Sequence, residues 1–247
     1  MASGAHKSHA RIVIHGTGRM ARALAQAAAE AGHFDVQALV GPHPPDWETQ
    51  APWFAGLEEL PPHPLPQLLI DFTLPDGTLV AAHWCAKRKV PLLSGVTGLP
   101  RETLEALRRT ALGAPVLWSP NLSLGINLLA DLAARAAAVL DPGTPVTIED
   151  IHHQWKKDAP SGTALMLGAA IAAERGGDDG AIEYRSRREG EVIGEHLVTF
   201  RLAGESFDLA HRAEDRGIFA RGALDAGLWL LRQAPGFYSA RDWLAGR

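Results

Sequence analysis

The stretch RIVIHGTGRMARALAQAAAEA, residues 11–31, decides the fold of this chain. Its first five residues form a short apolar run of the kind that makes a buried strand. Residues 19–31 are rich in alanine and favour a helix. The glycines between these two segments allow the backbone to turn sharply from one into the other. The sequence therefore predicts a strand, a glycine-rich turn and a helix near the start of the chain.

The turn itself matches the pattern Gly-x-Gly-x-x-Ala, formed by Gly16, Gly18 and Ala21. In a Rossmann-type domain the first glycine permits the tight turn, and the second lets a pyrophosphate approach the backbone. The start of the following helix offers N–H groups to phosphate oxygens. An ordinary glycine turn between a strand and a helix remains an alternative. The position of the motif favours a dinucleotide-binding loop.

Short apolar runs and helix-like segments continue to alternate up to about residue 120. The pattern predicts strands at residues 36–40, 68–72, 91–93 and 115–118, with helices at 78–89 and 100–112. Such alternation favours a parallel sheet with crossover helices. Residues 41–66, rich in proline and tryptophan, are predicted to be irregular surface.

Polar and glycine-rich clusters follow three of these predicted strands, and ligands collect at the carboxyl ends of parallel strands. An alternative explanation is that turns commonly contain glycine and threonine whether or not a ligand binds there. The recurrence at successive strand ends nevertheless favours one shared crevice. The clusters are Asp71-Phe72-Thr73, Gly95-Val96-Thr97-Gly98 and Ser119-Pro120-Asn121-Leu122.

The end of the second strand does not indicate which dinucleotide would bind. An acidic residue there usually holds the ribose hydroxyls of NAD, and an arginine accommodates the 2′-phosphate of NADP. The chain has neither, since it reads Val40-Gly41-Pro42-His43-Pro44. The residues leave NADH and NADPH open.

After residue 121 the pattern changes to longer strands with few helices. A helix is predicted at 122–140, a strand at 146–152 and a second helix at 161–175. Three more strands follow, at 182–186, 196–202 and 205–211. We therefore expect a separate, smaller α+β domain with a mixed sheet at residues 122–217. The first domain would comprise residues 10–121 and a C-terminal helix at 218–247, within which the helical pattern covers residues 218–232.

The segment His152–Thr163, HHQWKKDAPSGT, contains the densest group of side chains suited to catalysis and anion binding. Ser161-Gly162-Thr163 precedes an apolar run and indicates a helix N-terminus, which suits an anion. The histidines and lysines upstream add positive charge and a group that titrates near neutral pH. This combination suits a small dicarboxylate beside a proton source. A solvated loop is an alternative. A metal half-site is another, but no third ligand stands at a convincing spacing, so no metal is expected.

The same segment resembles the signature of the 4-hydroxy-tetrahydrodipicolinate reductase family, also called dihydrodipicolinate reductases. The likeness extends over nearly the whole chain, because further landmarks of that family occur in family order. They are Asp71-Phe72-Thr73-x-Pro75-x-Gly77-Thr78, Gly95-x-Thr97-Gly98, Asn121-x-Ser123-x-Gly125-x-Asn127 and Gly194-Glu195-His196.

The resemblance implies an NAD(P)H-dependent reduction of 4-hydroxy-tetrahydrodipicolinate to tetrahydrodipicolinate, in lysine and diaminopimelate biosynthesis. It implies that His152 is a proton donor or acceptor and Lys156 a proton donor. His153, Gly162 and Thr163 would hold the carboxylates of the substrate, and the assembly would be a homotetramer built through the second sheet. NADH or NADPH would lie along Gly16, Thr17, Gly18, Arg19, Met20, Gly95, Val96, Thr97, Ser119, Pro120, Asn121 and Leu122.

Composition excludes several other classes of protein. The formal net charge of −4 gives no electrostatic reason to expect a nucleic-acid partner. No apolar run approaches the ~20 residues needed to cross a bilayer. The first ten residues are polar and predict a tail rather than a signal peptide. The single cysteine, Cys85, favours a reducing compartment, so a cytoplasmic location is expected.

Two rival functions fit the same two-domain plan. One is a sugar or amino-acid dehydrogenase, which would use a lysine base and would not need paired histidines before it. The other is a cofactor-sensing regulator that has lost its chemistry. The presence of both His152 and Lys156 argues against this second alternative.

Overall fold

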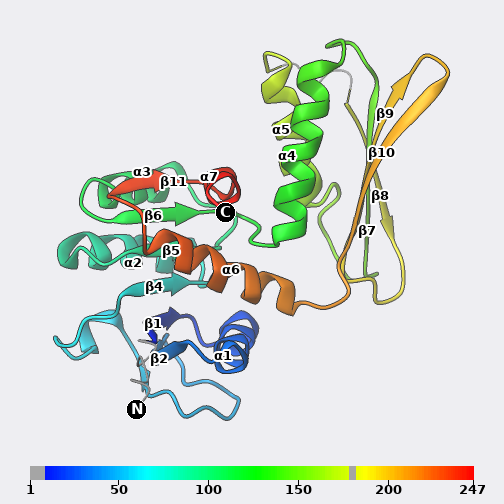
Figure 1. The fold of residues 1–247 in the computed structure, drawn as a ribbon. Coiled ribbons are helices and arrows are strands. Elements are labelled where there is room, and N and C mark those ends of the chain that lie inside the picture. Colours follow the sequence, from blue (N-terminus) through cyan, green and yellow to red (C-terminus); the bar gives the residue numbers. More distant parts are fainter. Residues whose placement is uncertain (1–8, 178–181) are drawn as a thin grey trace, which may run out of the picture. The chain divides into compact units, whose positions relative to one another are not determined.

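The computed structural model describes residues 9–177 and 182–247, so most of the predicted N-terminal tail lies outside the described residues (Figure 1). The chain divides into two compact units. Unit 1 runs up to Leu122 and resumes at Phe219, and unit 2 comprises Ser123–Ile218.

Unit 1 is built on a parallel sheet of seven strands in the order β11-β6-β5-β4-β1-β2-β3. Strand β1 lies between β4 and β2, so the connection after β2 and β3 crosses to the opposite side of β1. Ligands of open parallel sheets bind at such a switch point. The strands are β1 (Ala10–His15), β2 (Phe34–Val40), β3 (Trp53–Phe54), β4 (Leu68–Asp71), β5 (Leu92–Ser94), β6 (Pro115–Trp118) and β11 (Gly236–Tyr238).

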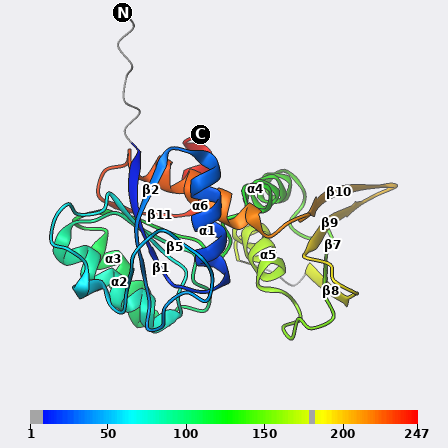
Figure 2. The ribbon, with the colours of Figure 1, turned by 90° about the horizontal axis from the view of Figure 1, so that it is seen from below.

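Helices cover both faces of this sheet because alternate strand residues point to opposite sides. Ile12 and Ile14 of β1 pack with α1 (Arg19–Ala31), α6 (Gly217–Leu230) and α7 (Ala240–Ala245). Val13 packs on the other face with α2 (Pro75–Arg88) and α3 (Arg101–Thr110). Figure 2 shows these two layers on either side of the sheet. The buried apolar runs of the sequence are therefore the central strands of a Rossmann-type domain.

Unit 2 has two helices packed on one face of a mixed four-stranded sheet, in the order β10-β9-β7-β8. Strands β7 and β8 are parallel, whereas β9 is antiparallel to both of its neighbours. Alternate residues of β7 are buried, and the core includes Ile148, Leu167 and Phe200. The elements are α4 (Leu124–Val139), β7 (Val146–His152), α5 (Gly162–Glu174), β8 (Ile182–Arg188), β9 (Glu195–Leu202) and β10 (Glu205–Arg212).

The helical pattern at 218–232 is confirmed by α6, but the expectation of a single helix continuing to residue 247 is wrong. Helix α6 ends at Leu230, and Pro235-Gly236 prevents its continuation, since proline lacks the amide donor and glycine is a poor helix former. The chain instead adds β11 beside β6 and then forms α7, whose capping box pairs Ser239 with Asp242. The C-terminal segment thus extends the first sheet as well as covering it.

Residues 41–66 are mostly irregular, as the composition predicts, but they are anchored at two points. The indole of Trp47 donates to the carbonyl of Thr17 at 3.0 Å, and that of Trp53 donates to the carbonyl of Gly41 at 2.9 Å. Strand β3 and the short 3-10 helix Leu57–Glu59 also lie in this region, and the sequence pattern did not indicate either. Trp47 thus links this surface segment to the glycine loop, and Trp53 holds it near the end of β2.

Within the residues that the structure describes, no helix is long and apolar enough to span a bilayer.

Candidate active site

The polar clusters predicted in unit 1 follow β1, β4, β5 and β6, which are neighbours in the parallel sheet. Their loops therefore meet at one edge. Gly16 has a φ of +122°, which only glycine adopts readily. Its amide donates a hydrogen bond to the main-chain carbonyl of Val40 at 2.7 Å. A Cβ on Gly16 would lie 3.1 Å from the carbonyl oxygen of Phe72. This close approach explains why the first position of the loop is glycine.

The N-terminus of α1 suits a phosphate. Its N-cap residue, Gly18, provides no side-chain cap, and the first turn contains no acidic residue. Nothing lies within 4 Å of the position of a Cβ on Gly18. The amides at this end of the helix and the positive end of its dipole are therefore available to an anion.

Asp71, at the carboxyl end of β4, ties the neighbouring loops together. The side chain is fully buried and accepts hydrogen bonds from the hydroxyls of Thr73 (2.6 Å), Thr78 (2.6 Å) and Ser94 (2.9 Å). His15 Nδ1 lies 3.2 Å from the same carboxylate. Burial, the largest single influence, raises the pKa of Asp71, but these polar neighbours together lower it. Asp71 is therefore an ionised structural group rather than a ligand-facing one.

The loops after β5 and β6 are held by short-range contacts of their own. Trp118 Nε1 donates to the carbonyl of Val96 at 2.9 Å, and Ser119 Oγ donates to the carbonyl of Asn121 at 2.6 Å. A Cβ on Gly95 would lie 2.4 Å from the ring of Phe72, so a larger residue at this position would have to displace that ring. The three predicted cofactor segments are thus preorganised at the same sheet edge.

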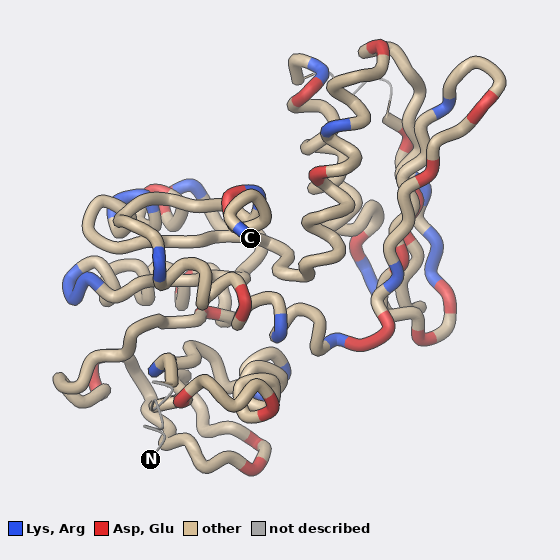
Figure 3. The backbone as a smooth tube through the Cα atoms, viewed as in Figure 1, with Lys and Arg blue, Asp and Glu red and all other residues tan. Residues whose placement is uncertain are grey.

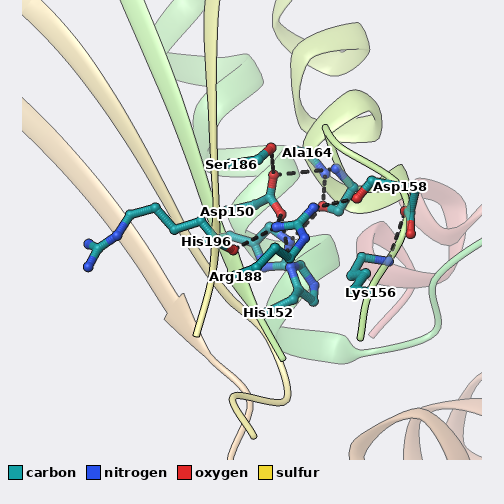
Figure 4. Close-up of polar contacts among 10 residues, drawn as sticks. Asp150, His152, Lys156, Asp158, Ala164, Ser186, Arg188 and His196 are labelled. Atoms are coloured by element: carbon teal, nitrogen blue, oxygen red, sulfur yellow. Dashed lines mark hydrogen bonds and ion pairs between the residues drawn. The ribbon is translucent and has the colours of Figure 1, made fainter. Parts of the chain in front are cut away.

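In unit 2, His152 stands at the end of β7 with its ring largely buried. Its Nδ1 lies 2.9 Å from Oδ1 of Asp150, two residues earlier on the same face of the strand (Figure 4). Burial, the largest influence, lowers the pKa of His152, and the positive charges of Lys156 and Arg188 lower it further. The bond to Asp150 opposes this shift without cancelling it. His152 is therefore neutral at pH 7.

Asp150 is fully buried and receives several donors from other elements. Ser186 Oγ donates to its Oδ2 at 2.6 Å, and the amide of Ser161 donates to the same oxygen at 3.3 Å. Arg188 Nη1 lies 2.9 Å from Oδ1. Burial by itself raises the pKa of Asp150, but these hydrogen bonds and the charge of Arg188 outweigh it and lower the pKa. The carboxylate stays ionised inside unit 2.

The predicted substrate-binding residues surround the start of α5. Ser161 is its N-cap and accepts a hydrogen bond from the amide of Ala164 at 3.1 Å. The first turn carries no acidic residue, and nothing lies within 4 Å of a Cβ on Gly162. The ring of His153 packs 5.9 Å from that of Trp155, and its Nδ1 is buried without a hydrogen-bond partner. The predicted carboxylate-binding residues Gly162 and Thr163 thus stand at an anion-binding helix end, where the Gly162 amide donates a hydrogen bond to the carboxylate of Asp158.

Lys156 lies in the loop between β7 and α5, with its ammonium 2.8 Å from the carboxylate of Asp158. The bond from Lys156 is the main reason why the pKa of Asp158 is lowered. The side chain of Lys156 keeps 23% of its surface exposed. It is a charged donor at the edge of the site, whereas His152 is a neutral group within it.

Three residues of this site were not predicted from the sequence as site residues: Asp150, Arg188 and His196. His196 Nε2 lies 3.4 Å from Ser161 Oγ, and its ring contacts that of His152 edge-on at 5.2 Å. The alternation of buried residues in β7 places Asp150 on the same face as His152, and this is the one sequence signal that could have identified it. Arg188 and His196 come from β8 and β9, which only the sheet brings next to β7.

His196 makes the stability of the protein depend on pH. Burial, with the nearby charge of His152, lowers its pKa to about 3. The unfolded chain binds a proton below about pH 6.5, which the folded protein does not, so stability falls as the pH falls from 6.5 towards 3. The contribution of His196 to this loss is roughly 2 kcal/mol at pH 5.

Urea unfolding at pH 7 and pH 5 measures this effect. We expect His196→Gln to lose less free energy of unfolding than the parent protein between the two pH values. His83→Gln, on the exposed face of α2, is the control and should keep the parental pH dependence. An unchanged pH dependence in His196→Gln would contradict the assignment.

Among the described residues, no group of three or more histidine, cysteine, aspartate or glutamate side chains is arranged to hold a metal ion. The paired histidines of the sequence are separated in role, since His152 binds Asp150 and His153 packs near Trp155.

Comparison with known proteins agrees with these features. Residues 10–122 match the family model for the N-terminus of dihydrodipicolinate reductase, and residues 125–244 match the model for its C-terminus. A 4-hydroxy-tetrahydrodipicolinate reductase of Stenotrophomonas maltophilia is 44% identical over 95% of this chain and 97% of its own. The corresponding protein of Xanthomonas euvesicatoria is 42% identical over 95% and 98%.

Solved structures share the fold. The dipicolinate-bound dihydrodipicolinate reductase of Paenisporosarcina sp. TG-14 superposes with a TM-score of 0.80 at 23% identity, covering 94% of this chain and 97% of the other. A myo-inositol dehydrogenase of Corynebacterium glutamicum reaches 0.67 at 14% identity, covering 96% and 93%. The chain therefore belongs to the dihydrodipicolinate reductase family, the NAD(P)H-dependent oxidoreductases that reduce 4-hydroxy-tetrahydrodipicolinate to tetrahydrodipicolinate on the way to diaminopimelate and lysine.

Proposed function

We propose that unit 2 binds the dicarboxylate substrate and moves the proton, and that unit 1 binds the nicotinamide dinucleotide. The observation that carries this assignment is the buried Asp150–His152 pair beside the N-terminus of α5. Together these groups offer a proton-exchanging nitrogen and an anion-binding helix end within one small region.

The carboxylates of the substrate would be bound by His153, Gly162 and Thr163. The amides at the start of α5 and the positive end of its dipole favour a negative charge there, worth about 0.3–1 kcal/mol for an exposed site. The ammonium of Lys156, paired with Asp158, adds a positive charge beside this helix end. This arrangement selects for a small, doubly charged substrate over a neutral sugar.

The dinucleotide would lie along the glycine loop and the segments after β5 and β6. Gly16, Thr17, Gly18, Arg19 and Met20 form the phosphate-binding turn, and the amide groups at the start of α1 suit a pyrophosphate. Gly95, Val96, Thr97, Ser119, Pro120, Asn121 and Leu122 form the adjacent rim. When bound, the nicotinamide ring supplies the hydride.

The proton is handled by side chains of unit 2. Asp150 holds Nδ1 of His152, so Nε2 is the ring nitrogen that can accept or return a proton. Lys156, whose ammonium pairs with Asp158, is the donor. General acid–base catalysis of this kind contributes about 10²–10⁴-fold in rate.

Both NADH and NADPH are expected to serve as cofactors. The end of β2 has no carboxylate that would repel the 2′-phosphate of NADPH, and it has no arginine that would bind this phosphate. The test follows NADH and NADPH oxidation separately, with substrate made in situ by the preceding synthase. Sugars and polyols tested in parallel address the rival dehydrogenase function. Turnover of a polyol without turnover of the dipicolinate precursor would refute the proposal.

We further propose a cytoplasmic homotetramer assembled through the sheet of unit 2. Helices of this unit cover one face of the sheet, and Figure 3 shows that basic and acidic residues are interspersed along its strands. The Glu183–Arg185 and Glu195–Arg212 ion pairs lie on the face opposite the helices. Light scattering coupled to size exclusion should give four times the chain mass of 26.4 kDa. A mass of one chain at micromolar concentration would contradict this assembly.

A further inference from the structure

The carboxylate of Asp150 is fully enclosed within unit 2. The residue is 0% exposed, and four groups from three elements contact its two oxygens. They are His152 Nδ1 from β7, Ser186 Oγ and Arg188 Nη1 from β8, and the amide of Ser161 at the start of α5 (Figure 4).

We propose that Asp150 is a positioning residue of the reductase, one that fixes the tautomer and the orientation of His152. This inference rests on the proposed role of His152 in proton transfer. A carboxylate accepts hydrogen bonds only, so the 2.9 Å contact requires the proton on Nδ1. Nε2 then carries the lone pair and is the nitrogen that exchanges a proton with the substrate.

Ring orientation follows from the same contact. A Cβ on Gly194 would lie 3.2 Å from Nε2 of His152, and the ring of His196 meets that of His152 edge-on. The imidazole is therefore confined between β9 and Asp150. Without the carboxylate, neither its tautomer nor its rotation about Cβ–Cγ would be defined by a charged partner.

Arg188 extends the influence of Asp150 to the loop that carries Lys156. One amino group of its guanidinium binds Asp150, and the other donates to the main-chain carbonyl of Asp158. Asp158 in turn pairs with Lys156. A single buried carboxylate thus positions His152 directly and the Lys156 loop through Arg188.

The first experiment measures the tautomer by NMR of full-length protein with ¹⁵N-labelled histidine rings. Subtraction of the spectrum of His152→Gln identifies the signals of His152. We expect the parent protein to carry the proton on Nδ1 and Asp150→Asn to lose this single form. The same tautomer in both proteins would overturn the proposal.

The second experiment measures steady-state kinetics over pH. Asp150→Asn should lower kcat by about 10²–10⁴-fold, since a histidine that loses its orienting carboxylate adopts the wrong tautomer. KM for the dinucleotide should stay near the parental value, because its proposed site lies in unit 1. Asp150→Glu, which keeps the charge, should recover activity above that of Asp150→Asn.

The pH profile separates positioning from a purely structural role. The groups that face His152 are Asp150, Lys156, Arg188 and His196. Loss of the Asp150 charge removes stabilisation of the imidazolium, so the acidic limb of kcat/KM should move to lower pH in Asp150→Asn. Lower activity with an unmoved limb and an unchanged tautomer would mean that Asp150 only supports the fold.

Glu149→Gln is the matched control, because Glu149 neighbours Asp150 on β7 but lies on the opposite face of the sheet. It should keep the parental tautomer, kcat and pH profile. Circular dichroism and dinucleotide binding show whether each variant is folded. If the parent protein reduces no dipicolinate precursor, the proposed function fails, whereas the NMR result still decides whether Asp150 fixes His152.

Discussion

Lys156→Ala is expected to lower kcat by about 10²–10⁴-fold while leaving the affinity for the dinucleotide largely intact. The lysine ammonium is the charged proton donor beside the helix end that receives the substrate, and water replaces it poorly as a positioned acid. Its ion pair with Asp158 is partly exposed, so its loss should change stability by no more than about 1 kcal/mol.

Lys157→Ala is the matched control for this prediction. Lys157 is the next residue in the same loop and is exposed, so removing it changes the net charge equally without removing the proposed donor. Stopped-flow measurement of NADH or NADPH oxidation gives kcat, and calorimetry gives the affinity for the dinucleotide. Lost affinity with retained turnover in Lys156→Ala would be incompatible with the assignment.

The pH profile of Lys156→Ala carries a second, independent signature. The charge of Lys156 lowers the pKa of His152, and so its removal should move the pKa of His152 upward. The acidic limb of any residual activity should shift to higher pH, opposite in direction to the shift expected for Asp150→Asn. The two variants therefore separate the effects of the two charges on one histidine.

Asp71→Ala is expected to lower the free energy of unfolding by about 3–5 kcal/mol, because it leaves several buried donors unpaired at once. The hydroxyls of Thr73, Thr78 and Ser94 all donate to this carboxylate. Since the total stability of a domain is about 5–15 kcal/mol, this loss would be a large fraction of it.

Urea unfolding followed by circular dichroism measures the change. Asp71→Asn keeps the shape and one acceptor oxygen, so it should lose less stability than Asp71→Ala. Asp35→Ala, at an exposed position of β2 in the same sheet, should change the free energy by no more than about 0.5 kcal/mol. Equal stability of Asp71→Ala and Asp35→Ala would show that the network around Asp71 contributes nothing.

Much of unit 1 is predictable from the sequence because its signals are local. A buried strand such as β1 is a contiguous apolar run, and the Gly16–Gly18 turn is defined by residues that follow it directly. Strand β11 was not predictable in this way. β11 is only three residues long and exists because β6 offers it a partner more than a hundred residues earlier in the chain.

The site in unit 2 likewise has one part that local sequence signals predict and another part that depends on strand pairing. By itself the sequence determined the segment that carries His152, Lys156 and the N-terminus of α5, since all of it lies within twelve consecutive residues. Only the tertiary structure revealed why His152 has one defined ring nitrogen to offer. The partners of Asp150 in β8 lie 36 and 38 residues away, and their contact depends on the pairing of β7 with β8. Residues that are neighbours along the chain can be recognised from the sequence. The surroundings of a buried charge such as Asp150 depend on which strands pair and on the exclusion of water, and these are properties of the tertiary structure.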